Sequence, residues 1–250
     1  MATATILANA GDGFIQNVNY AGNWDIPRDS ALGTVVTNYQ SSNGISVYRD
    51  TGRGGGTYLF RRSFFYFNTA AVTGTVTAAD LYIKRLSIGS NPGSRIMVVK
   101  SNAFGGDGLS ALAAADNIDY PGYSAASSMS GAVTDYITSA FDYTAVASGD
   151  YAVISLNSTA FTDIATDDYW IIMVVNYDYD YLDTIPASSP TYIDNGLYYR
   201  DATGTSNDPK IVVTYTPPGY GHDVIGVTST DIVEVNSVAA ADIVSINDVT

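Results

Sequence analysis

The chain has 250 residues, of which 46% are apolar and 14% charged, so it can form one sizeable domain plus an appendage. A net charge of −14 makes a phosphate backbone an unfavourable partner, which argues against nucleic-acid binding. The chain has no cysteine, which excludes disulfides, cysteine-ligated zinc and thiol nucleophiles. No signal peptide is visible and no apolar run approaches the ~18 residues of a membrane span, so we expect no membrane insertion.

Short strand-forming segments dominate the chain. They are rich in β-branched and aromatic residues and cover 34–37, 58–60, 63–67, 81–86, 95–100, 151–156, 169–175, 192–193 and 211–215. Segment 169–175 is apolar on both faces, so we place it centrally in a sheet. Glycine-rich and asparagine-rich clusters, among them 41–44 and 52–56, are typical of turns. This spacing predicts an all-β jelly-roll β-sandwich.

Helix is expected to be minor. Segment 109–116 could form two turns, and 158–165 one or two, with Asn157 or Ser158 as N-cap. Two prolines and two glycines in 216–221 indicate a linker. We therefore predict a sandwich over 1–217, and a linker with a repetitive tail over 218–250.

The tail carries an 11-residue repeat. The sequence Asp-Ile-Val-Glu-Val-Asn-Ser-Val at 231–238 returns as Asp-Ile-Val-Ser-Ile-Asn-Asp-Val at 242–249. Such a unit is too small to bury its own apolar side, which favours an oligomerisation or docking peptide over a segment folded back on its own domain. The period fits a right-handed helical supercoil, whereas the Ile and Val content favours short extended pieces. The candidate assembly residues are Val224, Val227, Ile232, Val235, Val238, Ile243, Ile246 and Val249.

Three segments, read in order, resemble a known family. They run from Arg61-Arg-Ser-Phe-Phe-Tyr-Phe-Asn-Thr, through Ile154-Ser-Leu-Asn-Ser-Thr-Ala-Phe, to Gly204-Thr-Ser-Asn-Asp-Pro-Lys-Ile-Val-Val. Together they resemble the DNRLRE-like jelly-roll domains, which are related in shape to carbohydrate-binding modules and occur on bacterial surface proteins and in phage structural proteins. Asn68 stands where that family usually has Asp. The resemblance covers residues 5–217 and implies a jelly roll without known catalytic residues; the tail is similar to repeats of phage structural proteins.

Residue types argue against catalysis. Glycoside hydrolysis usually needs two carboxylates, and the only glutamate, Glu234, lies in the tail. The only histidine, His222, lies in the linker, so a Ser-His-Asp triad lacks a positioned base. An aspartate pair, for example within Asp167, Asp168, Asp178 and Asp180, is the remaining route. We therefore expect that the protein is not an enzyme.

Two kinds of binding residue stand out. If 176–183 were a strand, Asp178 and Asp180 would face the same way, and with Asp183 they could hold a structural calcium ion. A solvated acidic loop is the alternative, and we expect no other cofactor. Exposed aromatic side chains can stack on sugar rings; the candidates are Trp24, Tyr177, Tyr179, Tyr181, Tyr198 and Tyr199.

These observations favour a non-catalytic structural or attachment protein. The first hypothesis is a phage virion component at the virion surface: a capsid decoration, fibre or tail-associated subunit. It would assemble through its tail with itself, as a trimer for example, and with other virion proteins. The alternative is a carbohydrate-binding module of a bacterial cell-surface or secreted, extracellular protein. Both hypotheses allow contact with cell-surface glycans.

Overall fold

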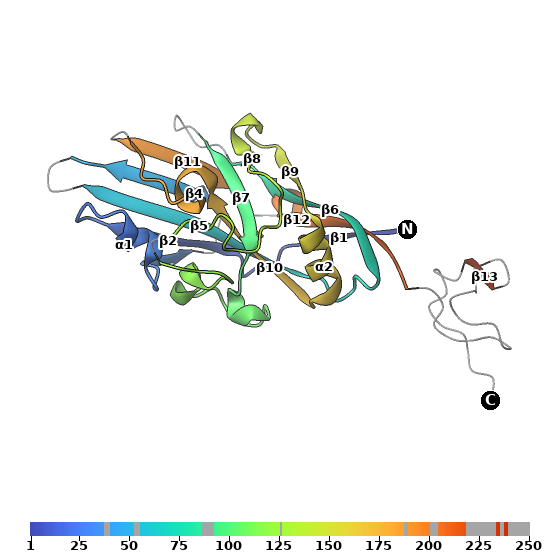
Figure 1. The fold of residues 1–250 in the computed structure, drawn as a ribbon. Coiled ribbons are helices and arrows are strands. Elements are labelled where there is room, and N and C mark those ends of the chain that lie inside the picture. The colour runs from blue at the N-terminus through green and yellow to red at the C-terminus, as the bar shows by residue number, and fades with distance from the viewer. Residues whose placement is uncertain are drawn as a thin grey trace.

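The computed structural model describes residues 1–37, 41–52, 56–86, 93–125, 127–187, 190–200, 205–218, 234–235 and 238–239. Within them the chain forms a β-sandwich of antiparallel sheets with only short helices (Figure 1). The predicted all-β sandwich is therefore confirmed. No helix in the described ranges is long and apolar enough to span a membrane.

The smaller sheet has four strands. Their order is β1 (Ala2–Leu7), β12 (Lys210–Thr216), β6 (Thr75–Lys84) and β9 (Tyr151–Ser155). Along β6, Leu81 and Ile83 are fully buried whereas Tyr82 and Lys84 are half-buried. This alternation is the expected result of a sheet with one face on the core and one face outward.

The larger sheet carries the central strands. Its strands follow the order β11 (Thr191–Leu197), β4 (Ser41–Asp50), β5 (Thr57–Asn68), β10 (Tyr169–Asn176), β7 (Arg95–Lys100) and β8 (Phe141–Asp142). Outside this order, β2 (Gly13–Asn19) pairs with both β5 and β3 (Val35–Thr37). Residues 170–176 are all buried. The predicted central position of this apolar segment is confirmed, since β10 lies between β5 and β7.

The helices are short and lie between strands. They are α1 (Asp25–Asp29), α2 (Ser158–Thr166), the 3₁₀ turns η1 (Phe104–Gly106), η2 (Ala114–Ile118), η3 (Tyr143–Ala145) and η5 (Thr205–Asn207), and the π-helix η4 (Tyr177–Tyr181). The prediction at 158–165 is confirmed: the Asn157 side chain accepts a hydrogen bond from the Ala160 N–H at 3.1 Å, which caps the helix.

The two-turn helix expected at 109–116 is wrong. Only the 3₁₀ turn η2 forms there. The Asp116 carboxylate accepts hydrogen bonds from the backbone N–H groups of Phe104, at 3.2 Å, and Ala113, at 3.0 Å. Such side-chain bonds offer the backbone an alternative to a helix, and here they close a loop.

The turn expected at 41–44 is also wrong, because these residues belong to β4. A Cβ atom at Gly44 would lie 2.7 Å from the Tyr199 hydroxyl. The Gly44 carbonyl also accepts a hydrogen bond from the Ser63 hydroxyl at 2.8 Å. Gly44 therefore permits close packing inside a strand rather than marking a turn.

Of the predicted linker and tail, 218–250, the structure describes residues 218, 234–235 and 238–239. β13 (Glu234–Val235) and β14 (Val238–Ala239) pair antiparallel, with Val235 opposite Val238. Extended pieces are one of the two local structures left open by the sequence. The remaining candidate assembly residues lie outside the described residues: Val224, Val227, Ile232, Ile243, Ile246 and Val249.

Candidate ligand-binding site

The segment after β10 turns into a helix instead of continuing as a strand. The Asn176 side chain accepts a hydrogen bond from the Tyr179 N–H at 2.9 Å and so caps η4. In the helical segment Asp178 and Asp180 have very different surroundings. The side chain of Asp180 is 1% exposed, whereas that of Asp178 is 30% exposed and meets Arg95. The strand-like alternation predicted for these two carboxylates is wrong.

Asp180 is the centre of a buried ionic network. The Arg62 guanidinium donates from Nε and Nη2 to the two Asp180 carboxylate oxygens, both at 2.7 Å. The Nε atom of Arg28 lies 3.7 Å from Asp180 Oδ1, and all three side chains are 1% exposed. Burial, the largest single influence, would lower the Arg62 pKa, but the charge of Asp180 and its hydrogen bonds with Arg62 act in the opposite direction, and the net result is a raised pKa. The network fastens η4 to β5 and α1.

The predicted calcium ligands are therefore held by other partners. Asp178 pairs with Arg95, and Asp180 with Arg62. Asp183 accepts the Trp24 indole N–H at 3.0 Å and lies 3.3 Å from Arg28. The structure does not bring these carboxylates together as a calcium site, and the described residues contain no cluster of three potential metal ligands.

Three of the predicted sugar-stacking residues are buried: Trp24, Tyr181 and Tyr199. Trp24 is 3% exposed and packs edge-on against Phe60, with ring centroids 4.4 Å apart. Tyr199 is fully buried; its hydroxyl lies 2.6 Å from the Ser63 hydroxyl. Trp24 and Tyr199 are buried and line none of the pockets described for this structure, so these two predictions are wrong. Tyr179 and Tyr198 are half-buried and do not line the pocket described next.

The half-buried Tyr177 and the buried Tyr181, which is 3% exposed, line a pocket of about 390 Å³. The rings of Tyr177 and Tyr181 are stacked, with centroids 5.3 Å apart and planes inclined by 21°. The Arg95 guanidinium lies 4.7 Å from the Tyr177 ring centre, and its Nε donates to Asp178 at 3.1 Å. The pocket is completed by Met97, Ser130, Gly131, Asp135, Thr138, Ser139 and Ala140.

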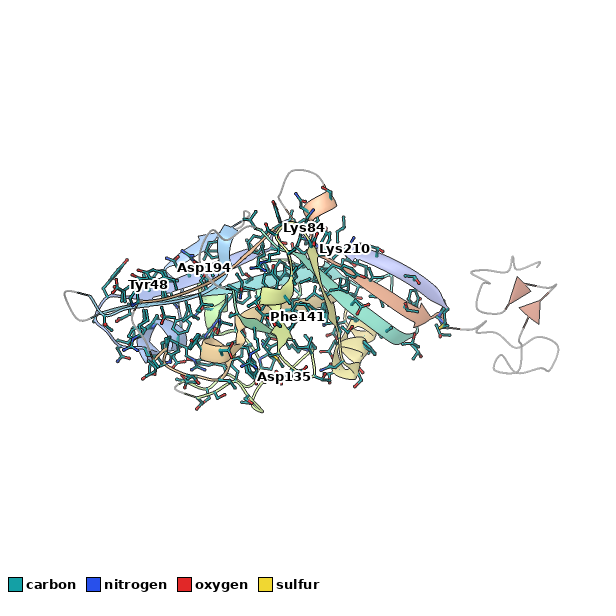
Figure 2. The ribbon with its side chains drawn as sticks, turned by 90° about the horizontal axis from the view of Figure 1, so that it is seen from above. Tyr48, Lys84, Asp135, Phe141, Asp194 and Lys210 are labelled. Carbon is teal, nitrogen blue, oxygen red and sulfur yellow. The ribbon has the colours of Figure 1, made fainter. Side chains whose placement is uncertain are left out.

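Asp135 supplies an unsatisfied acceptor. Its Oδ2 accepts the Tyr181 hydroxyl at 2.8 Å, while Oδ1 is buried and receives no hydrogen bond from the described residues. Burial raises the Asp135 pKa above its usual value, and the bond from Tyr181 offsets part of the rise. Asp135 is positioned beside β7 by its antiparallel bridge to Val99, and Figure 2 shows it at the edge of the sandwich.

We expect Asp135→Asn to stabilise the fold at neutral pH. A carboxyl whose pKa is raised by folding favours the folded state when protonated, and this contribution is lost as the pH rises through the folded-state pKa. The variant's advantage in free energy of unfolding should thus be present at pH 7 and fade towards pH 3. Urea unfolding at several pH values measures it, with the exposed Asp150→Asn as control. An advantage that does not change with pH would contradict desolvation of Asp135.

A second cavity, of about 630 Å³, is a weaker candidate. It is lined by Asp167 and Asp168, the aspartates considered for acid–base chemistry, together with Lys100. The ammonium of Lys100 lies 2.9 Å from Asp163 and 3.7 Å from Asp167. These charges satisfy one another, and within the described residues no buried acceptor lining this cavity is left without a donor. The Tyr177–Tyr181 pocket is therefore the candidate site.

The sequence indicated Tyr177 and Tyr181 but missed Arg95 and Asp135. Both are ordinary residues in the sequence, and only the pairing of distant segments brings them to η4. No model of a known protein family matches the chain, and a comparison with curated proteins gives no match either. The assignment of the site therefore follows from its geometry.

Proposed function

We propose that the protein is a non-catalytic attachment protein that binds carbohydrate in the Tyr177–Tyr181 pocket. The observation that carries this proposal is a stacked tyrosine pair beside a buried acceptor that lacks a donor. Ligand pockets combine an apolar wall with a few placed polar groups, and typically measure about 300–1,000 Å³. At about 390 Å³, this pocket suits one or two sugar units.

The chemistry of a sugar matches both the aromatic and the polar residues of the pocket. The C–H face of a pyranose ring is apolar and packs against aromatic side chains, here against the part of the Tyr177 ring that Tyr181 and the Arg95 guanidinium leave uncovered. The sugar's hydroxyl groups can donate to the Asp135 carboxylate and exchange hydrogen bonds with the pocket hydroxyls of Thr138 and Ser139. A ligand hydroxyl would give the Asp135 carboxylate a donor in addition to the Tyr181 hydroxyl, which should contribute to affinity.

Binding without cleavage is supported by the placement of the carboxylates. Glycoside hydrolysis needs an acid and a second carboxylate on either side of the scissile bond. Asp135 lines the pocket, but Asp178 is paired with Arg95. We therefore propose attachment rather than turnover, and oligosaccharides incubated with the protein should be recovered at full length.

The setting for such attachment remains the one that the sequence favours. A virion component that touches host glycans, and a bacterial surface or secreted module, would both use this pocket. For the virion hypothesis we propose in addition that the tail beyond residue 218 assembles the protein with itself and with other virion proteins. The resemblance to DNRLRE-like domains supports either setting.

Tyr177→Ala should weaken glycan binding by about tenfold. The substitution removes the half-buried ring that stacks on Tyr181 and leaves the buried network of Asp180 in place. Binding is measured by calorimetry on glycans selected from an array screen of the full chain. Tyr192→Ala is the matched control, because Tyr192 is 41% exposed and also half of an aromatic pair, with Tyr48. Equal losses in both variants, or none, would contradict the proposed site.

A further inference from the structure

We infer that the pocket selects a sugar bearing a positively charged amine, with Asp135 as the group that recognises it. The inference rests on the proposed function and concerns the same pocket. Its basis is the charge balance among the pocket residues. Arg95 and Asp178 neutralise each other at the rim, whereas Asp135 takes part in no ion pair within the described residues. The pocket thus retains one negative charge.

The three lysines of the chain do not supply a positive charge that would pair with Asp135. Lys84 and Lys210 lie beside the Tyr151 ring, at 5.6 and 4.9 Å from its centre. Figure 2 shows them at the side of the sandwich opposite to Asp135. Lys100 is bound by Asp163 at 2.9 Å. A ligand cation therefore has no competitor among these three residues.

The local environment favours a charged donor over a neutral one. The Asp135 carboxylate lines the pocket, and among the described residues its side chain accepts only the hydroxyl of Tyr181. Hydrogen bonds between ionised partners are about twice as strong as those between neutral groups, and the low local dielectric strengthens them further. The uncovered part of the Tyr177 ring packs against the sugar while the ammonium pairs with the Asp135 carboxylate. A uronic acid, which carries a negative charge, would be repelled by Asp135.

The test compares two oligosaccharides that share one backbone. A glucosamine tetramer and an N-acetylglucosamine tetramer are titrated into the full chain by calorimetry at pH 6, where the free amines are charged. We expect the glucosamine tetramer to bind about tenfold more tightly. In Asp135→Asn the two should bind with similar affinity, while Asp150→Asn should keep the preference of the wild type.

The outcomes separate this inference from the proposed function. Equal affinities in the wild type, with both lost in Tyr177→Ala, would overturn the amine preference and leave carbohydrate binding intact. A preference that persists in Asp135→Asn would also overturn the inference, since it would reflect general attraction to a chain of net charge −14. Failure of both tetramers and of every array glycan to bind would overturn the proposed function itself. Circular dichroism of Asp135→Asn verifies that the variant is folded.

Discussion

Asp180→Asn is expected to lower the free energy of unfolding by about 3–5 kcal/mol, the usual cost of breaking a buried ion pair. The substitution keeps the shape of the side chain but removes the charge that compensates Arg62, whereas Arg28 keeps Asp29 and Asp183 as partners. The Arg62 side chain is 1% exposed, so water cannot replace the lost partner. Urea denaturation measures the change. Because η4 carries Tyr177 and Tyr181, we also expect weaker glycan binding.

Asp178→Asn is the matched control for this experiment. It lies two residues away in the same π-helix, and its Arg95 partner has a side chain that is 50% exposed. Pairs at the surface are worth about 0–1 kcal/mol, so this variant should remain nearly as stable as the wild type. Similar losses in the two variants would show that the charge of Asp180 does not hold the network.

Gly122→Ala should destabilise the protein by roughly 2–5 kcal/mol. Gly122 has φ +85°, and a Cβ atom there would lie 1.8 Å from the Ala132 carbonyl oxygen. The backbone must therefore move in the loop that leads to Ser130, Gly131 and Asp135, which line the pocket. We expect both a lower urea midpoint and weaker glycan binding.

Gly149→Ala is the control that separates the effect of the steric contact at Gly122 from the effect of backbone strain. Gly149 has the same φ of +85°, but a Cβ atom there would meet nothing within 4 Å beyond its own chain neighbours. Only the left-handed conformation is penalised, at about 1–2 kcal/mol, and glycan affinity should stay at the wild-type level. If Gly122→Ala were no more harmful than Gly149→Ala, the packing of Gly122 against Ala132 would not matter.

The sequence predicted the central strands well because their pattern is local. Segment 169–175 is apolar on both faces, and a central strand is the arrangement that buries both. β1 and β2 were missed. β1 alternates small residues, Ala and Thr, in place of large apolar ones, so its pairing with β12 depends on partners distant in sequence. Gly44 was assigned to a turn for the same reason, since its contact with Tyr199 joins residues 155 positions apart.

The candidate site was predictable only in part. The tyrosines of 177–181 are conspicuous, but their alternation with aspartate resembled a strand, and the cap from Asn176 that begins the π-helix went unnoticed. One feature of the sequence could have corrected the assignment of Asp180. Arg62 stands, with Arg61 and Ser63, in a strand that is otherwise rich in aromatic residues, and an arginine that such a strand buries needs a carboxylate partner. Pairing Arg62 with an aspartate would have removed Asp180 from the calcium candidates.

The network around Asp180 also limits how the pocket can be transferred to another scaffold. η4 is only five residues long, which makes it attractive for grafting onto a different β-sandwich. Its geometry, however, depends on Arg62 in β5 and Arg28 in α1, which lie far from it in the sequence. A graft of 176–183 alone would bury an uncompensated carboxylate in the recipient. Protein engineers would need to move both arginines with the loop, or replace all three residues together by apolar ones.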